Sequence, residues 1–157
     1  MTPRPRHIPE GFQAISPALV INDASRAIEF YEKVFGAKQR MRLMGPAGKI
    51  VHAELVIGDA VFSVADEFPA WGNHGPTLTG DSPVRIVLFV EDVDEVAKRA
   101  VAAGARMLIA VSDQFYGDRS GRLMDPFGHV WIISSHKEDV TPSEMRRRME
   151  AISQQAK

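Results

Sequence analysis

The chain has 157 residues, of which 45% are hydrophobic and 25% charged, and its formal net charge is −1. These values are typical of one globular domain or of two small modules that share a core. A net charge near zero gives no broad attraction to nucleic acid or to an anionic membrane. No stretch approaches the roughly 20 apolar residues of a membrane-spanning helix, and the start lacks the apolar region of a secretory signal. Because cysteine is absent, disulfides and thiol chemistry are excluded, and we expect a cytoplasmic protein.

The first half of the chain predicts an N-terminal arm followed by one α/β unit. Residues 1–13 are rich in proline and arginine, which favours an extended arm. In the unit that we place at 14–66, Asp23 can cap a helix over 24–36 that has one apolar face. Gly36 is placed to end this helix. The predicted strands are 14–21, 38–44, 49–57 and 60–66, the last two forming a hairpin around Gly58 and Asp59.

The second half repeats this pattern after a Pro- and Gly-rich linker loop over 67–83. The second unit, 84–136, contains strands at 84–90 and 106–112, a helix after Asp92 that ends at Gly104, and a hairpin around the DPFG turn. The pairs Asp23/Asp92, Gly36/Gly104 and Gly58/Gly128 are 69, 68 and 70 residues apart, which indicates an internal repeat. The predicted fold is therefore α+β: two tandem βαβββ units that form a cupped mixed sheet within one structural domain.

A C-terminal helix is predicted within 137–157. Thr141 is a capping residue, Pro142 stands at the first helical position, and Glu144 follows Thr141 by three residues. Met145, Met149 and Ile152 then form an apolar stripe. We expect this stripe to pack against the body of the protein or against a second subunit.

Four stretches carry a resemblance to a known family. They are VINDASRAIEFYEKVFGA (20–37), HAELVIGDAVF (52–62), GDRSGRLMDPFGHVW (117–131) and SSHKEDVTPSEMRRRM (134–149). The chain resembles the vicinal oxygen chelate superfamily, which includes glyoxalase I, bleomycin resistance proteins and extradiol dioxygenases. Within it, the chain is most similar to the PhnB-like or glyoxalase-like subfamily. The resemblance implies paired βαβββ units, a small-molecule ligand and a homodimer.

The resemblance also implies where a divalent metal would bind. Family enzymes take two ligands from the first strands, counted back from the helix-capping Asp, and two from the last strands, counted forward from the turn Gly. Here those counts give Ser16, Arg85, Phe62 and Ile132. None is a usual ligand of a divalent metal, and Arg85 adds a repelling positive charge. A register slip of one residue brings in no carboxylate or imidazole either, so we predict no metal at this site.

Polar residues on the predicted strands are candidates for a ligand cavity. His52 and Glu54 alternate with apolar residues and share one face of a strand, and the repeat places Arg122 at the position of His52. We expect all three to line the cavity, and His52 could serve as a general base. The alternative is a structural His–Glu pair at a sheet rim or dimer contact. A second metal site through His52, Glu54 and His129 or His136 is also conceivable.

Aromatic and charged residues in two predicted loops extend the candidate cavity. Phe115, Tyr116, Asp118 and Arg119 precede the last hairpin and could hold a planar or polar ligand by stacking and charge-assisted hydrogen bonds. The alternative is a local Asp–Arg pair that stiffens a turn, with aromatic rings that close the edge of the core. Trp71, in the linker loop, is either a lid or a loop anchor.

Three classes of function are open at this point. We predict a metal-independent small-molecule-binding protein with no cofactor. The alternative is a lyase, isomerase or dioxygenase of the same superfamily that uses one divalent metal ion. A purely structural or partner-binding module is the third class. The sequence assigns neither a catalytic residue nor the identity of the ligand.

Overall fold

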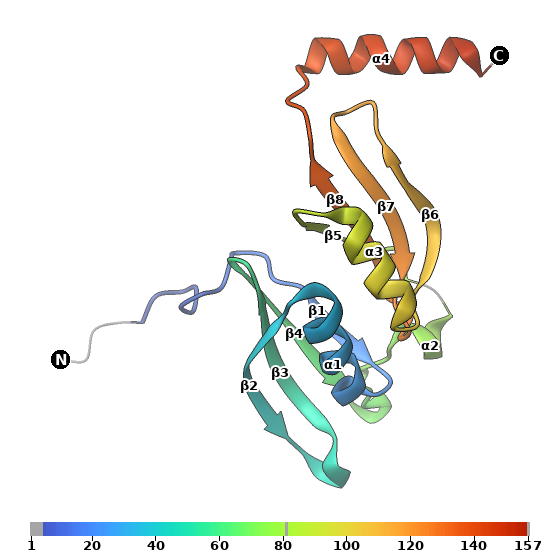
Figure 1. Cartoon of the computed structure of the whole chain (residues 1–157). Coiled ribbons are helices and arrows are strands. Elements are labelled where there is room, and N and C mark those ends of the chain that lie inside the picture. The colour runs from blue at the N-terminus through green and yellow to red at the C-terminus, as the bar shows by residue number, and fades with distance from the viewer. Residues whose placement is uncertain (1–4, 81, 157) are drawn as a thin grey trace. The chain divides into compact units, whose positions relative to one another are not determined.

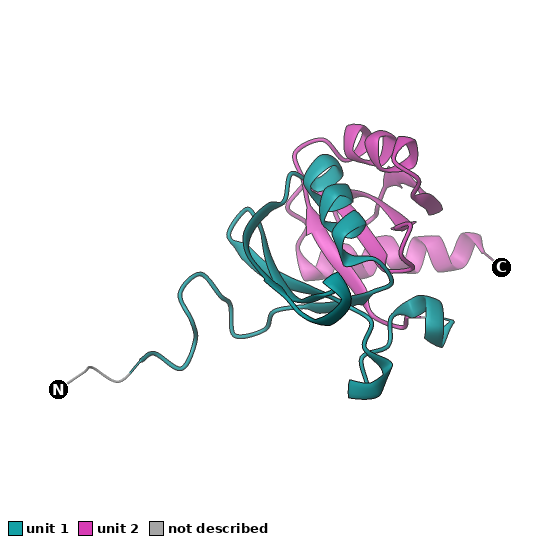
Figure 2. Ribbon diagram, turned by 90° about the horizontal axis from the view of Figure 1, so that it is seen from below, with its two compact units in different colours: residues 1–81 teal, residues 82–157 magenta. Residues whose placement is uncertain are grey.

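The computed structural model describes residues 5–80 and 82–156. The chain divides into two compact units, Met1–Asp81 and Ser82–Lys157, which Figure 2 shows in teal and magenta. Each unit is described by itself below.

The first unit is a four-stranded mixed sheet with one long helix on one of its faces (Figure 1). Its strand order is β1-β4-β3-β2, in which β1 runs parallel to β4 and the other neighbours are antiparallel. The elements are β1 Ala18–Ile21, α1 Ala24–Phe35, β2 Lys38–Met44, β3 Ile50–Ile57 and β4 Ala60–Asp66. Short helical turns follow at η1 Pro46–Gly48, η2 Pro69–Trp71 and α2 Pro76–Thr79.

The second unit repeats this topology. Its strand order is β5-β8-β7-β6, again with one parallel pair, β5 and β8. The elements are β5 Arg85–Phe89, α3 Val93–Ala102, β6 Arg106–Asp113, β7 Asp118–Met124 and β8 Val130–His136. The C-terminal helix, α4 Pro142–Gln155, follows β8. The predicted α+β fold of two βαβββ units and a C-terminal helix is confirmed.

The helices begin and end where the sequence places their caps. The Asp23 side chain accepts a hydrogen bond from the backbone N–H of Arg26, and Gly36 ends α1 in the left-handed conformation. Asp92 caps α3 in the same way through the N–H of Glu95. The apolar face of α1 is buried against the first sheet, and its largest fully buried side chains are Tyr31, Ile28 and Val34.

Three local expectations differ from the structure. The first strand begins at Ala18 and not at residue 14. The predicted linker loop contains η2 and α2. The stretch that we expected to be a loop before the last hairpin is strand from Asp118 onward. Its polar residues suggested a loop, but in the structure their side chains alternate between the two faces of the sheet.

The capping of α4 is confirmed, since the Thr141 hydroxyl accepts a hydrogen bond from the N–H of Glu144 at 3.2 Å. No residue of α4 is buried, and the side chains of Met149 and Ile152 are 44% and 46% exposed. Among the described residues, no helix is long and apolar enough to cross a membrane.

Candidate functional site

In the second unit the two faces of the sheet have different chemistry. One face is covered by α3 and holds the buried side chains of Leu123, Trp131 and Ile133. The other face, which we call the helix-free face, carries the alternate residues of the same strands. On it Ser120 lies opposite Ser134, and Arg122 lies opposite Ile132. The period-2 alternation of the strands thus separates a structural face from one that can hold a ligand.

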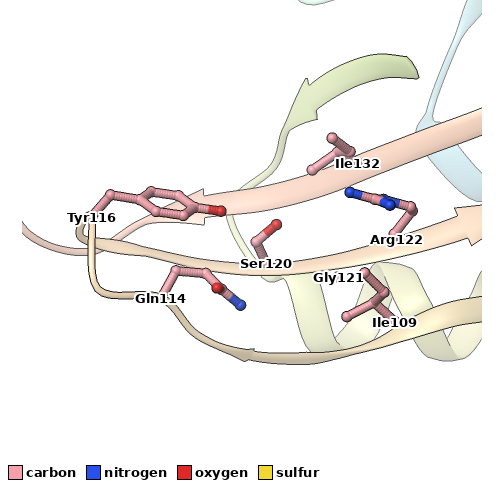
Figure 3. Close-up of a pocket in the computed structure, with 7 residues that line it drawn as sticks. All are labelled: Ile109, Gln114, Tyr116, Ser120, Gly121, Arg122 and Ile132. Carbon is pink, nitrogen blue, oxygen red and sulfur yellow. The ribbon is translucent and has the colours of Figure 1, made fainter. Parts of the chain in front are cut away.

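A pocket of about 120 Å³ opens on the helix-free face of the second unit (Figure 3). It is lined from β6, β7, β8 and the β6–β7 turn by Ile109, Gln114, Tyr116, Ser120, Gly121, Arg122 and Ile132. Two of these, Tyr116 and Arg122, are among the ligand-binding residues predicted from the sequence. A third, Ile132, is the residue at the family's metal-ligand position.

The Arg122 side chain lies among neutral groups. Its neighbours across the two ladders are Ile109 on β6 and Ile132 on β8. Its Nε is buried and has no hydrogen-bond partner. Among the described residues of the second unit, no carboxylate forms an ion pair with this guanidinium. The pocket therefore contains a fixed positive charge that the described residues of this unit do not compensate.

Tyr116 lies at the end of the pocket next to the β6–β7 turn. Its ring meets that of Phe115 edge to face, with the centroids 5.2 Å apart, and in Figure 3 its hydroxyl points along the pocket toward Ser120. The Phe115 carbonyl accepts a hydrogen bond from Arg148 on α4. The turn that presents Tyr116 is thus tied to the C-terminal helix.

Asp118 and Arg119, which are neighbours in sequence, point to opposite faces of β7. Arg119 lies on the α3 side, where it forms a bidentate ion pair with Asp94 at 2.7 and 2.9 Å and a further contact with Asp113. These carboxylates raise the pKa of Arg119. Asp118 instead contacts His136. The local Asp–Arg pair that we considered as an alternative does not form, and Arg119 does not line the pocket.

His136 lies between two carboxylates at the end of β8. Its Nε2 is 2.8 Å from Asp139 Oδ1, and its Nδ1 is 2.7 Å from Asp118 Oδ1. The hydrogen bonds to Asp139 and then to Asp118 raise the pKa of His136 above its ordinary value. This arrangement favours the imidazolium form, which has no lone pair to offer a metal ion.

In the first unit, His52 and Glu54 lie side by side on β3. His52 Nε2 is 3.3 Å from Glu54 Oε1, and Arg40 Nε is 3.1 Å from Glu54 Oε2. Arg40 also donates to the Glu10 carbonyl and lies over the Phe12 ring at 5.4 Å. The Glu54 carboxylate is therefore neutralised locally, and the N-terminal arm lies against the same cluster.

Trp71 belongs to the 3₁₀ turn after β4. It is 59% exposed and stacks on Phe68, with ring centroids 4.4 Å apart. The Lys49 ammonium, just before β3, lies 5.2 Å from the centre of the Phe68 ring. These contacts anchor the loop.

The strand register corrects one of the four metal-ligand positions. Ser63 lies opposite Glu54 and pairs with Ala18, just as Ile132 lies opposite Arg122 and pairs with Val87. Phe62 is 5% exposed, and its ring contacts Tyr31 on α1. The position equivalent to Ile132 is therefore Ser63, and our assignment to Phe62 was wrong by one residue.

The cause of this error is the length of the two turns. Ile57 pairs with Ala60, so the first hairpin turns through two residues, whereas Met124 pairs with Val130 and the second hairpin has a longer turn. Counting a fixed number of residues from the turn glycine therefore reaches opposite faces in the two units. The same register makes Glu54, and not His52, the equivalent of Arg122.

The corrected set still does not suit a divalent cation. Ser16 donates its hydroxyl to the Val61 carbonyl, and Arg85 donates to the Pro83 carbonyl at 2.8 Å. Ser63 offers one neutral hydroxyl, and Ile132 offers no donor atom. Within the described part of the chain, no three His, Asp or Glu side chains are grouped so that they could hold a metal ion.

Four lining residues were not predicted from the sequence: Ile109, Gln114, Ser120 and Gly121. Ser120 stands two residues before Arg122 and its hydroxyl bonds that of Ser134 at 3.0 Å, so strand alternation alone could have identified it. Ile109 and Gln114 come from β6 and the turn after it. Their positions depend on register shifts in the β6–β7 ladder, which no sequence pattern marked.

Comparison with known proteins agrees with this architecture. A profile of the Glyoxalase/Bleomycin resistance protein/Dioxygenase superfamily matches residues 13–133. An uncharacterized protein of Mycobacterium tuberculosis is 41% identical over 139 residues, which cover 87% of this chain and 82% of that protein. The crystal structure of TioX from Micromonospora sp. ML1 has a TM-score of 0.60 and 26% identity, covering 79% of this chain and 98% of the other. The protein PA1353 from Pseudomonas aeruginosa has a TM-score of 0.65 and 25% identity, covering 80% and 99%.

Two βαβββ units, each a mixed four-stranded sheet with a helix on one face, place this chain among proteins of the glyoxalase-like fold. The chain belongs to the glyoxalase/bleomycin resistance protein/dioxygenase superfamily.

Proposed function

We propose that this protein binds a small organic molecule without the help of a metal ion, on the helix-free face of its second unit. The observation that carries the proposal is the chemistry of the four metal-ligand positions, Ser16, Ser63, Arg85 and Ile132. Two hydroxyls, a guanidinium and an alkyl group cannot replace the hydration shell of a dication. In this proposal, the superfamily's architecture is retained while its electrophilic metal is not used.

Tyr116 and Arg122 are the residues we propose as direct ligand contacts, because both line the pocket. Phe115 supports the Tyr116 ring from its edge. Asp118 has an indirect role in the proposal: it forms an ion pair with His136 at the end of β8 and so helps to hold the start of β7 beside that strand. We leave Arg119 out of the contact set, since its guanidinium is held on the other face of the sheet by Asp94 and Asp113.

His52 and Glu54 enter the proposal as polar residues of the first unit's helix-free face. Glu54 contacts both Arg40 and His52. Because its carboxylate already has these partners, we propose that the cluster holds its own side chains in place on β2 and β3 and does not bind the ligand directly. Trp71 supports the linker loop through Phe68. On this proposal, Trp71→Ala leaves ligand binding unchanged.

The experiment is a fragment screen by ligand-observed NMR on protein purified without an affinity tag. Each hit is measured by calorimetry in EDTA and again with added Ni²⁺, Zn²⁺, Fe²⁺ or Mn²⁺. We expect fragments that bind with the same affinity in both conditions. Binding that appears only with a metal would favour the lyase, isomerase or dioxygenase class, and a screen without any hit would contradict the binding function.

We also propose a cytoplasmic homodimer of the PhnB-like or glyoxalase-like subfamily, without nucleic-acid or membrane partners. The family resemblance and the net charge of −1 support this. The exposed side chains of Met149 and Ile152 on α4 offer apolar surface to a second copy. Light scattering coupled to size-exclusion chromatography would give the mass of the assembly, and a monomer across the accessible concentration range would contradict the dimer.

A further inference from the structure

The guanidinium of Arg122 differs electrostatically from other arginines of the same unit. Arg119 is held by Asp94 and Asp113, Arg147 by Glu144, and Arg148 by Glu138 and Glu144. Arg147 is exposed, whereas Arg119 and Arg148 are half-buried, as Arg122 is. Arg122 differs from them because the described residues of its own unit supply it with no counter-charge.

A buried, unsatisfied N–H group is costly, and a partly desolvated charge without a partner is more so. Such groups are rare in native proteins, and a bound water, ion or other partner is one way in which they are completed. The Nε of Arg122 has no hydrogen-bond partner. A carboxylate that accepts from Nε and one Nη would satisfy this atom and neutralise the charge in a single fork-like contact.

The rest of the pocket selects the other part of the ligand. Ile109 and Ile132 flank Arg122 on the neighbouring strands, and the Tyr116 ring lies at the far end (Figure 3). No acidic side chain is among the lining residues. A cavity of about 120 Å³ is below the 300–1,000 Å³ typical of sites for drug-sized ligands, so the matching ligand is small.

We infer that the ligand is a small organic monoanion, a carboxylate with a compact apolar or aromatic body. Its carboxylate pairs with Arg122, and its body lies against Ile109 and Ile132 with its edge toward Tyr116. This inference rests on the proposed metal-independent binding function and assigns the chemical class of its ligand.

The test compares charged probes with neutral probes of the same shape. Calorimetry or saturation-transfer NMR measures benzoate against benzamide, phenylacetate against phenylacetamide, and 3-methylbutanoate against its amide. We expect at least one carboxylate to bind about tenfold or more tightly than its amide, the size expected for charge-assisted hydrogen bonds. The advantage should shrink as salt concentration rises.

Variants assign the effect to Arg122. In Arg122→Met, an apolar side chain of similar length replaces the charge, so the carboxylate should lose about tenfold or more while the amide is unaffected. Arg122→Lys keeps the charge without the fork and should recover part of the affinity. Arg106→Met is the matched control, since Arg106 is an exposed arginine of β6 whose side chain donates to the sulfur of Met124 at 3.8 Å. Thermal melting checks that each variant is folded.

The possible results distinguish the carboxylate assignment from the proposed small-molecule-binding function. Amides that bind as tightly as their acids, or Arg122→Met protein that binds benzoate like the unaltered chain, would overturn the anion assignment. If the fragment screen yields only neutral or cationic hits, the small-molecule-binding function stands and the anion assignment falls. If the screen finds no hit of any charge, both fall.

Discussion

The carboxylate of Asp125 accepts hydrogen bonds from the backbone N–H groups of Phe127 and His129 and from the indole N–H of Trp131, at 2.9, 3.0 and 2.9 Å. Asp125 is only 3% exposed, and Trp131 is 2% exposed. One side chain therefore shapes the turn before β8 and fixes the largest ring of the second unit's core. That turn sets the register of β8, and so places Ile132 in the pocket.

The Asp125→Ala variant should be strongly destabilised. It leaves three donors unsatisfied, two of them in a buried environment, and we expect a loss on the order of 3 kcal/mol in the free energy of unfolding. Urea unfolding followed by circular dichroism measures it. Asp59→Ala is the control, because Asp59 is an exposed residue of the corresponding hairpin turn in the first unit. Equal losses in the two variants would contradict a special role for Asp125.

His136 gives the stability of the second unit a predictable dependence on pH. Its pKa is raised by Asp139 and Asp118 above the ordinary value of 6.5, so the folded protein binds the proton more tightly than the unfolded chain does. The stabilisation is fully present below that value and is lost as the pH rises through the higher pKa of the folded state.

We therefore compare the unaltered chain with His136→Gln at about pH 5.5 and about pH 8.5. The unaltered chain should be the more stable at the lower pH, and the difference should shrink at the higher pH. An NMR titration of the imidazole signals checks the same point directly. A His136 signal that titrates at or below the ordinary histidine value would refute the assignment.

At the scale of elements, Gly117 joins the β6–β7 turn to the segment that leads into α4. Its φ is +99°, and its carbonyl accepts hydrogen bonds from the backbone N–H groups of Lys137 and Glu138. A Cβ added at Gly117 would overlap the carbonyl oxygen of Glu138. Because Tyr116 is the preceding residue, this junction also sets where the phenol enters the pocket.

Gly117→Ala should lower the melting temperature by more than Gly72→Ala does. Both glycines have positive φ, which costs an alanine roughly 1–2 kcal/mol, but nothing lies within 4 Å of a Cβ at Gly72. The control thus isolates the backbone overlap from the dihedral strain. We also expect Gly117→Ala to weaken ligand binding through Tyr116. Similar melting temperatures for the two variants would show that the backbone at Glu138 moves away from the added Cβ without loss of stability.

The same elements show how far the sequence could predict this structure. The helices followed from apolar periodicity and from caps such as Asp23 and Thr141, because these signals are local. The face to which each strand residue points depends on register, which turn length and bulges decide. That is why Phe62 was assigned to the wrong face. Asp118 and Arg119 look like one polar cluster in the sequence, yet the alternation of β7 separates them.

At the scale of the whole molecule, the two repeated units have diverged at equivalent positions. Glu54 and Arg122 occupy the same place in their sheets, as do Ser63 and Ile132. In the first unit Glu54 is neutralised by Arg40, whereas no carboxylate among the described residues of the second unit neutralises Arg122. The Arg122 site was predicted only in part from the sequence, since the repeat pointed to this residue but its missing counter-charge is a property of the fold.

Because neither unit has metal-binding side chains at the family's ligand positions, we predict that divalent metal ions do not stabilise the protein. A ligand that binds only the folded state must raise the melting temperature as its concentration rises. Because Ser16, Ser63, Arg85 and Ile132 hold the positions of the family's ligands, Ni²⁺, Zn²⁺, Fe²⁺ and Mn²⁺ should each leave the melting temperature of tag-free protein unchanged. Elemental analysis of the same preparation should find far less than one metal ion per chain. A stoichiometric ion, or a melting temperature that climbs with metal concentration and falls again with EDTA, would mean that other side chains form a centre, and binding would then have to be reinterpreted as metal chemistry.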